Sequence, residues 1–246
     1  MNVLMLTAMR SGSTYLFNML KATGSFSFPA PHAEHPSLKA QAEIGEFLAP
    51  NGYLDPWDVH GIPKTKELCE QHLKKKANLP FRPPCLLKIL KEHFEYYLLD
   101  YDDRPLVETL FPKPKYIWLE REDVFARTVS AYQFFVSKMP HLWNERMQAE
   151  YKAKEIPWDT KGILDVYYNH VKNCDWGPFL EGANHHHVEY EDLIARPQEV
   201  LQGCLDYLGM KGDVESIVAK QPKIKTERPE TKEYVQRLKR TLTGML

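Results

Sequence analysis

The sequence predicts an α/β fold in which a central, mostly parallel β-sheet is flanked by helices. Two observations support this prediction. Short apolar segments of strand type alternate with segments of helical periodicity, and such alternation produces a parallel sheet with helices on both faces. The first apolar segment also runs into a glycine-bearing loop and then a helix, an order typical of phosphate-binding α/β proteins. The three strand-like segments are "NVLML" (2–6), "CLLKIL" (85–90) and "KYIWLE" (115–120).

The length and charge of the chain limit its class. It has 246 residues, which suits one sizeable domain, and we expect a single domain over residues 1–246. Its formal net charge is −1, so a protein that binds nucleic acid through a general basic surface is not expected. A local basic pocket for a small anion remains compatible with this balance.

The spacing of the cysteines and the length of the apolar segments bear on the cellular compartment in which the protein is expected. The four cysteines are far apart and form no C-x-x-C pair, which disfavours a zinc site and a redox motif. We expect free thiols in a reducing compartment. The N-terminal segment lacks the features of a signal peptide, and no stretch approaches the ~20 apolar residues of a membrane span. The sequence therefore predicts a cytoplasmic protein without a membrane span. The cysteines are Cys69, Cys85, Cys174 and Cys204.

The remaining elements follow from periodicity and end signals. The first helix ends at "KATG", with Gly24 suited to a left-handed position after the helix. Residues 25–64 are rich in Pro, His and Gly and form a long irregular stretch of the kind that is often functional. Later helices end at glycine or begin near proline. We expect helices over 38–48, 64–77, 122–136, 160–172 and 196–209, a short strand and turn within 186–193, and a last helix from 228.

The loop after the first strand, "TAMRSGSTYL" (7–16), resembles a phosphate-binding loop without its lysine. Unpaired amides at a helix N-terminus favour an anion, and Gly12 lets the backbone approach it closely. Ser11, Ser13 and Thr14 add hydroxyl groups, and Arg10 adds a planar fork for phosphate or sulfate oxygens. A small-residue turn with an incidental arginine would also fit this loop taken alone. Without the lysine, the loop disfavours ATP with Mg²⁺.

A second polar segment, "IWLEREDVFARTVSAYQFF" (117–135), follows the third strand. Arg121 stands at the strand's C-terminal end, where ligands of open α/β sheets bind. Ser130 lies in the next helix, on a face shared with Asp123, Arg127 and Phe134 and opposite the apolar stripe. A solvated polar face would explain most of these residues, although it explains Arg121 less well. The two segments together predict a ligand with two separated phosphate-like groups.

These two segments, in this order, resemble the sulfotransferase superfamily. The segment "VEYEDLIARPQEVLQGCLDYLG" (188–209) is also similar to the Tyr-Glu-Asp-Leu segment of that superfamily. The resemblance implies a three-layer fold of P-loop type and a donor, 3′-phosphoadenosine 5′-phosphosulfate (PAPS), that leaves as adenosine 3′,5′-bisphosphate (PAP). It implies a 3′-phosphate site at Arg121 and Ser130. It implies that the 5′-phosphosulfate site consists of Arg10, Ser11, Gly12, Ser13 and Thr14.

The closer resemblance is to the bacterial trehalose 2-sulfotransferase-like group. The chain shares with it the "RSGST" loop, the "ATG" after the first helix and the Asp two residues past Arg121. It departs from that group where "SFPAPHAEHPS" (27–37) replaces a Gly-Glu-Pro-rich stretch, so trehalose is not carried over as the acceptor. The group places its catalytic glutamate in this stretch, which implies Glu34 as the base; His32 and His35 are the alternatives.

The resemblance implies a sulfotransferase that transfers a sulfuryl group to a hydroxyl of a small-molecule or carbohydrate acceptor. In this reaction Arg10 and the loop amides would meet the charge that develops on the leaving oxygen, and no metal is required. A P-loop kinase and an inactive PAP-binding protein are the alternatives, and a homodimer stays open. Lys88 and Arg127 could add further contacts to the donor. The three adjacent histidines (185–187) lie on a predicted strand, where neighbouring side chains point to opposite faces, so they are not expected to bind one metal ion together. Aromatic residues that could line an acceptor pocket are Tyr132, Phe134, Phe135, Trp143 and Trp158.

Overall fold

The structure of the protein is a computed structural model. It describes residues 1–26, 85–91, 104–137, 145–172, 174–221 and 228–244. A four-stranded sheet of order β2-β1-β3-β4 lies at its centre, and all three strand pairs are parallel. This arrangement confirms the predicted α/β fold with a central parallel sheet. The strands are β1 (Asn2–Thr7), β2 (Cys85–Leu90), β3 (Pro114–Glu120) and β4 (His185–Glu189).

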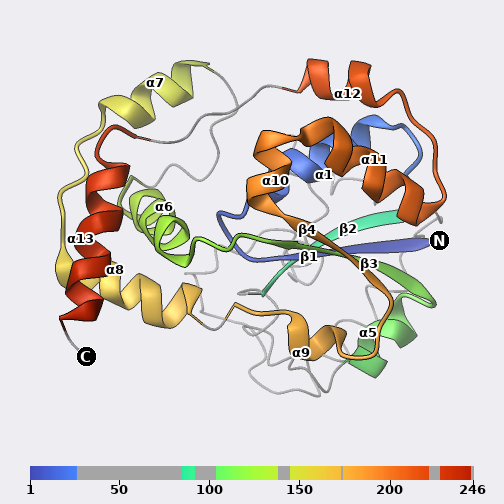
Figure 1. Ribbon diagram of the computed structural model, residues 1–246, viewed down its shortest axis with the longest axis horizontal. Helices are drawn as coiled ribbons and strands as arrows, with labels where there is room; N and C mark the ends of the chain where they lie inside the picture. Colours follow the sequence, from blue (N-terminus) through green and yellow to red (C-terminus); the bar gives the residue numbers. More distant parts are fainter. Residues whose placement is uncertain (27–84, 92–103, 138–144, 173, 222–227, 245–246) are drawn as a thin grey trace, which may run out of the picture.

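Helices cover both faces of the sheet (Figure 1). One face is covered by α1 (Ser13–Ala22), α10 (Tyr190–Ala195), α11 (Pro197–Leu208) and α12 (Val214–Lys220). The opposite face carries the short helices α5 (Arg104–Leu110) and α9 (Gly177–Leu180). β1 runs through the middle and is buried along its whole length, as expected for a central parallel strand between two helical layers.

A further group of helices packs beside the C-terminal edge of the sheet (Figure 1). It has its own apolar cluster, which includes Val129, Ile163 and Leu238, whereas the cluster around the sheet includes Leu4, Leu16 and Leu201. None of the helices in the described residues is long and apolar enough to cross a membrane. The group consists of α6 (Val124–Ser137), α7 (Glu145–Ala153), α8 (Thr160–Val166), the π-helix η3 (Tyr167–Val171) and α13 (Thr231–Thr243).

Several predicted boundaries are confirmed by the structure. The first helix ends at Ala22, and Gly24 has the left-handed φ of 71° that was expected for it. The helix α11 begins at Pro197 and ends before Gly209, whose φ is 70°. Predicted helices over 38–48 and 64–77 lie outside the described residues. The helices α5, α7, α9 and α12 were not predicted, because each is short and its apolar periodicity is weak.

Three local predictions are wrong. The single helix expected over 160–172 changes at Tyr167 into a π-helix, in which the amide of Lys172 donates to the carbonyl of Tyr167 at 2.8 Å. The turn expected after the fourth strand is the helix α10. Arg127, expected opposite the apolar stripe of α6, is instead 5% exposed and donates to the carbonyl of Val171. That carbonyl belongs to the last residue of the π-helix, which packs against α6.

Candidate anion site at the C-terminal edge of the sheet

The loop between β1 and α1 is held by its own hydroxyl groups. Ser11 Oγ donates to the carbonyl of Ala8 at 2.6 Å and is also hydrogen-bonded to Thr7 Oγ1. The Ser11 hydroxyl is buried and therefore stabilises the loop. Arg10 and Gly12 have left-handed φ angles of 62° and 79°. These two reversals turn the chain sharply and aim the Arg10 side chain away from α1, toward α6.

Arg10 contacts the second predicted anion segment directly. Its Nε donates to Ser130 Oγ at 3.0 Å, and its guanidinium carbon lies 5.7 Å from the centre of the Phe134 ring. Burial lowers the pKa of Arg10; the nearby Tyr151 acts in the opposite direction, and the cation of Arg121 lowers the pKa further. Because an arginine stays protonated in proteins, the result is a partly desolvated fixed cation. A cation in this partly desolvated position attracts an anion more strongly than a fully hydrated cation does.

Arg121 lies at the same edge, directly after β3. Its Nη1 donates to the carbonyl of Arg10 at 3.2 Å, and its guanidinium carbon lies 4.5 Å from the centre of the Tyr190 ring. The same ring packs against Gly12, where an added Cβ would come within 2.7 Å of it. Tyr190 therefore connects the loop with Arg121, and Gly12 is required by this close approach as well as by its φ angle.

Two further features suit this edge to an anion. No side chain caps α1 at Gly12 among the described residues, so the first amides of the helix are left to bind a ligand. The Nε of Arg121 is buried and has no hydrogen-bond partner within the described part of the chain. A buried donor without an acceptor is costly, and an anionic ligand would supply one. The residues present therefore fit a ligand with phosphate-like groups. The half-buried Thr14 and the buried Ser13 occupy the first turn of α1.

Other residues singled out in the sequence take different places. Lys88 is 1% exposed on β2, with its Nζ 5.9 Å from the centre of the Phe17 ring, so it is a core residue and not a surface charge. Tyr132 is buried among α6, α8 and α13, and Phe135 packs on Phe134. The predicted base residues Glu34, His32 and His35, together with Trp143, lie outside the described residues.

The three adjacent histidines alternate across β4. His185 and His187 lie beside Trp118 on one face, at ring distances of 5.9 Å and 4.4 Å. His186 stacks on Tyr207 on the other face, and burial lowers its pKa. Within the residues that the structure describes, no group of His, Cys, Asp and Glu side chains could hold a metal ion.

Two residues of the site were missed by the sequence analysis. Tyr190 was identified as part of a motif without a role. Its position directly after β4, at the edge where Arg121 follows β3, was the available signal. Trp176 donates its Nε1 hydrogen to the carbonyl of Thr7 at 2.9 Å and so fixes the start of the loop. A tryptophan distant in sequence gave no local signal for this contact.

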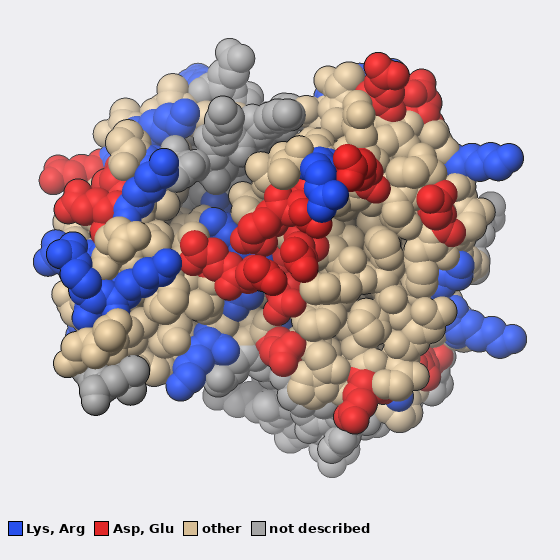
Figure 2. All heavy atoms as spheres, in the orientation of Figure 1, with Lys and Arg blue, Asp and Glu red and all other residues tan. Residues whose placement is uncertain are grey.

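The surface around the site carries mixed charge (Figure 2). Acidic side chains gather over α10 and the neighbouring strand end, and basic side chains lie over α13. On the face that Figure 2 shows, the described acidic and basic side chains therefore gather over different elements. The acidic residues of the two strand ends are Glu120, Glu122, Asp123, Glu189, Glu191 and Asp192.

Comparison with known proteins assigns a class to this fold and site. A family model described as "Sulfotransferase domain" matches residues 1–240. The chain therefore belongs to the sulfotransferase-domain family, and it is a sulfotransferase by family. This confirms the resemblance at the level of the superfamily. A search of curated proteins found no match.

Solved structures with a similar fold include three with low sequence identity. A sulfotransferase from Alicyclobacillus acidocaldarius is 14% identical, with a TM-score of 0.49 over 98% of this chain and 95% of that one. A sulfotransferase domain from the curacin biosynthetic pathway is 19% identical, with a TM-score of 0.43 over 98% and 96%. A retinol dehydratase in complex with androsterone and PAP is 13% identical, with a TM-score of 0.47 over 99% and 80%.

Proposed function

We propose that this protein transfers the sulfuryl group of PAPS to a hydroxyl of a small-molecule or carbohydrate acceptor. The observation that carries the proposal is the contact between Arg10 and Ser130, which brings the two predicted anion segments side by side. A donor with a 5′-phosphosulfate and a 3′-phosphate has the two separated anionic groups that these segments would bind.

The residues divide between the two anionic groups. The loop 10–14 binds the 5′-phosphosulfate through the amides at the start of α1, the Arg10 fork and the Thr14 hydroxyl. Arg121 and Ser130 bind the 3′-phosphate. The buried Nε of Arg121 supports this role, because it is a donor that lacks an acceptor among the described residues. The Ser11 hydroxyl bonds within the loop, so Ser11 contributes through its backbone.

PAPS supplies a sulfuryl group on a leaving phosphate, and the acceptor oxygen forms a bond to sulfur as the bond to the bridging oxygen breaks. The chain's own task is to align the two oxygens and to stabilise the negative charge that grows on the leaving one. Arg10 does this as a fixed, partly desolvated cation. The acceptor proton passes to a base, for which we propose Glu34, with His32 or His35 as alternatives.

The finer assignments have separate support. The "RSGST" loop and the Asp two residues past Arg121 favour the trehalose 2-sulfotransferase-like group, although the different acceptor stretch leaves the acceptor open. The free, buried thiol of Cys204 supports a reducing, cytoplasmic setting. We also propose a single domain over residues 1–246.

Two measurements test the proposed function. PAP should raise the melting temperature without added metal, and ATP with Mg²⁺ should not. Labelled PAPS is then offered with sugars, phenols and sterol alcohols, and transfer of the label to one of them establishes the activity. A requirement for ATP and Mg²⁺ would instead identify a kinase. A chain that binds PAP but transfers sulfate to nothing, water included, would be the inactive binding protein.

A further inference from the structure

The two predicted anion segments are joined a second time, behind the site. At the site itself, Arg10 donates to Ser130. The second connection runs through residues 171–176, which follow the helical part of η3. The first residue of this connecting segment accepts a hydrogen bond from α6, and its last residue donates one to β1. The loop after β1 and the helix after β3 are therefore each fixed from two sides.

The first end of the connecting segment holds Arg127. Val171 is the last residue of η3, so its carbonyl has no partner within that helix. This carbonyl accepts a hydrogen bond from Arg127 Nη2 and another from the backbone amide of Cys174 at 3.3 Å. Arg127 is 5% exposed, and its Nε has no hydrogen-bond partner in the part of the chain that the structure describes. Because burying a cation is costly, the bond to Val171 offsets part of that cost and fixes the side chain against η3.

The other end of the connecting segment holds the start of the anion loop. Trp176 is 1% exposed, and its Nε1 donates to the carbonyl of Thr7 at 2.9 Å. Thr7 is the last residue of β1, so this bond fixes the point at which the loop leaves the sheet. The Trp176 ring packs edge-on against Phe179 at 5.4 Å between ring centres, which restricts the indole from its other side.

The helix α6 relates the position of Arg127 to that of Ser130. Ser130 follows Arg127 by one turn of α6, and residues so spaced lie on the same helical face. The Oγ of Ser130 accepts from Arg10 Nε at 3.0 Å, and Arg10 lies in the loop that Thr7 begins. The contacts thus form a closed contact circuit. Its members are Thr7, Arg10, Ser130, Arg127, Val171 and Trp176.

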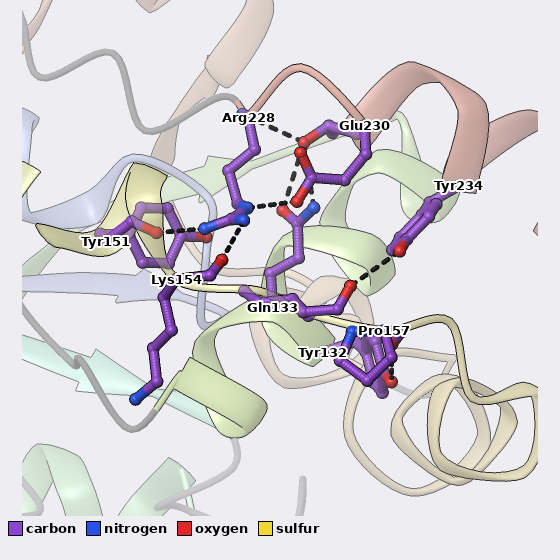
Figure 3. Close-up of polar contacts among 10 residues, drawn as sticks. Tyr132, Gln133, Tyr151, Lys154, Pro157, Arg228, Glu230 and Tyr234 are labelled. Carbon is purple, nitrogen blue, oxygen red and sulfur yellow. Dashed lines mark hydrogen bonds and ion pairs between the residues drawn. The ribbon is translucent and has the colours of Figure 1, made fainter. Parts of the chain in front are cut away.

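Other polar bonds around α6 stabilise the helices beside the site and do not belong to the contact circuit (Figure 3). Arg228, just before α13, donates to the carbonyl of Tyr151 in α7. Tyr234 of α13 donates to the carbonyl of Ile156 at 2.7 Å. Neither of these bonds involves the loop after β1. Removing the Tyr234 hydroxyl therefore tests the loss of one side-chain bond to a carbonyl without opening the circuit.

We propose that Arg127 and Trp176 are positioning residues that set the separation of the two phosphate subsites through the contact circuit. The inference rests on the proposed function, in which the loop binds the 5′ group and Arg121 and Ser130 bind the 3′-phosphate. A ligand with both groups requires both subsites at a fixed separation. A nucleotide with only a 5′-phosphate requires the loop alone, which keeps its internal bond from Ser11 to the carbonyl of Ala8.

The first test compares PAP with AMP, so that AMP binding reports whether each variant is folded. Trp176→Phe keeps an aromatic ring and removes the N–H group, and Arg127→Met keeps a long side chain and removes the fork. Each should weaken PAP binding about threefold to tenfold, the effect of one hydrogen bond, and AMP binding less than about twofold. Isothermal titration calorimetry measures both affinities. Equal losses for PAP and AMP in both variants would overturn the proposal.

Tyr234→Phe is the matched control for these variants. It also removes one side-chain hydrogen bond to a backbone carbonyl, so it should lower the melting temperature. Its ratio of PAP affinity to AMP affinity should stay that of the wild-type protein. A ratio lowered as much as in Trp176→Phe would mean that the ratio follows stability, and would contradict a special role of the contact circuit.

A double-mutant cycle tests whether Arg127 and Trp176 act together. Either variant opens the same contact circuit, so the second opening should add little. The double variant Arg127→Met/Trp176→Phe should bind PAP about as well as the weaker of the two single variants. Losses that multiply would show that the two residues act independently, against the proposal.

The last measurement needs no ligand. In ¹⁵N NMR spectra the Arg10 Nε–H signal, identified by its loss in Arg10→Lys, should exchange slowly with solvent, and Ser130→Ala shows the exchange without their bond. Arg127→Met and Trp176→Phe should each speed the exchange toward that of Ser130→Ala, whereas Tyr234→Phe should not. Wild-type exchange in both circuit variants would refute the proposal. If the exchange responds as expected but the wild-type protein does not prefer PAP to AMP, the proposed function alone is refuted.

Discussion

The Nε of Arg10 lies 3.0 Å from the Oγ of Ser130, a residue 120 positions later in the chain. The contact joins the loop after β1 to the helix after β3, and neither segment could form the site alone. In this state the Arg10 fork already has a neutral partner. Because a guanidinium has five N–H donors, this bond leaves the fork able to bind a phosphate-like group, and a hydrogen bond to such an anion is stronger than one to a neutral hydroxyl.

Replacing Arg121 should weaken binding of the bisphosphate PAP much more than binding of the monophosphate AMP. Arg121→Ala should weaken PAP binding by about 1.5–3 kcal/mol, the range for hydrogen bonds to charged groups, and AMP binding much less. Isothermal titration calorimetry measures both affinities. Arg196→Ala is the control, because Arg196 pairs with Asp192 and Glu199 at the surface. Equal losses for PAP and AMP would place Arg121 away from the 3′-phosphate.

Replacing Arg10 should affect turnover more than product binding. The charge on the bridging oxygen grows as its bond to sulfur breaks, so Arg10→Ala should lower kcat far more than it weakens PAP binding. Arg10→Lys keeps the charge without the fork and should give an intermediate kcat. Normal turnover in Arg10→Ala would mean that Arg10 only stabilises the loop and does not act on the leaving oxygen.

Two glycine substitutions separate backbone strain from close packing. Gly24→Ala should cost about 1 kcal/mol of unfolding free energy, since its φ is left-handed but nothing lies within 4 Å of an added Cβ. Gly12→Ala should cost about 1–3 kcal/mol more, because its Cβ would meet the Tyr190 ring at 2.7 Å. Chemical denaturation compares the variants, and only Gly12→Ala should lose PAP binding. Similar behaviour of both variants would argue against the Tyr190 contact.

The base is predicted from the sequence only. Glu34→Gln should lower turnover by about 10²–10⁴-fold and leave PAP binding intact. His32→Asn and His35→Asn are the parallel variants. Should one of them lose activity while Glu34→Gln keeps it, the base is that histidine. Full activity in all three would remove the base from this segment.

The buried thiol of Cys204 should make stability depend on alkaline pH. Burial raises the pKa of Cys204 to about 12 from an ordinary 9.0. Above the ordinary value the unfolded chain releases this proton and the folded chain keeps it, so unfolding becomes easier as the pH rises. At about pH 10 the wild-type protein should lose roughly 1 kcal/mol relative to Cys204→Ala, measured by urea denaturation at each pH. Parallel pH profiles would mean that the thiol is solvated.

Much of the fold could be predicted because each prediction used a local signal. Continuous apolar runs identified β1, β2 and β3, and glycines marked the ends of α1 and α11. Arg10 and Arg121 were predicted as site residues in the same way, because a residue that follows a strand has its position fixed by that strand. Ser130 lies inside α6 and was predicted from the helix face that it occupies and from the resemblance. The structure adds that the Arg10 side chain donates to Ser130 and that Arg121 donates to the backbone carbonyl of Arg10.

What the sequence could not predict depends on contacts between distant segments. The burial of Arg127 depends on the carbonyl of Val171, and the place of Trp176 depends on the carbonyl of Thr7. Tyr151 lies in a short, polar helix with little periodicity, and its partner Arg228 is 77 residues away. Helical propensity and hydrophobic pattern contain no information about such pairs.

The π-helix at Tyr167–Val171 has a consequence for sequence length. A π turn holds one residue more than an α turn, and each residue advances a regular helix by about 100°. Deleting one residue here would restore ordinary helical winding and would rotate the chain that follows by that angle relative to α6. The Val171 carbonyl would turn away from Arg127, and Trp176 would be displaced from the start of the anion loop. The extra residue thus sets the rotation of the chain that follows the π-helix. A relative without it would need an added residue before Trp176 to keep the loop after β1 in the same orientation.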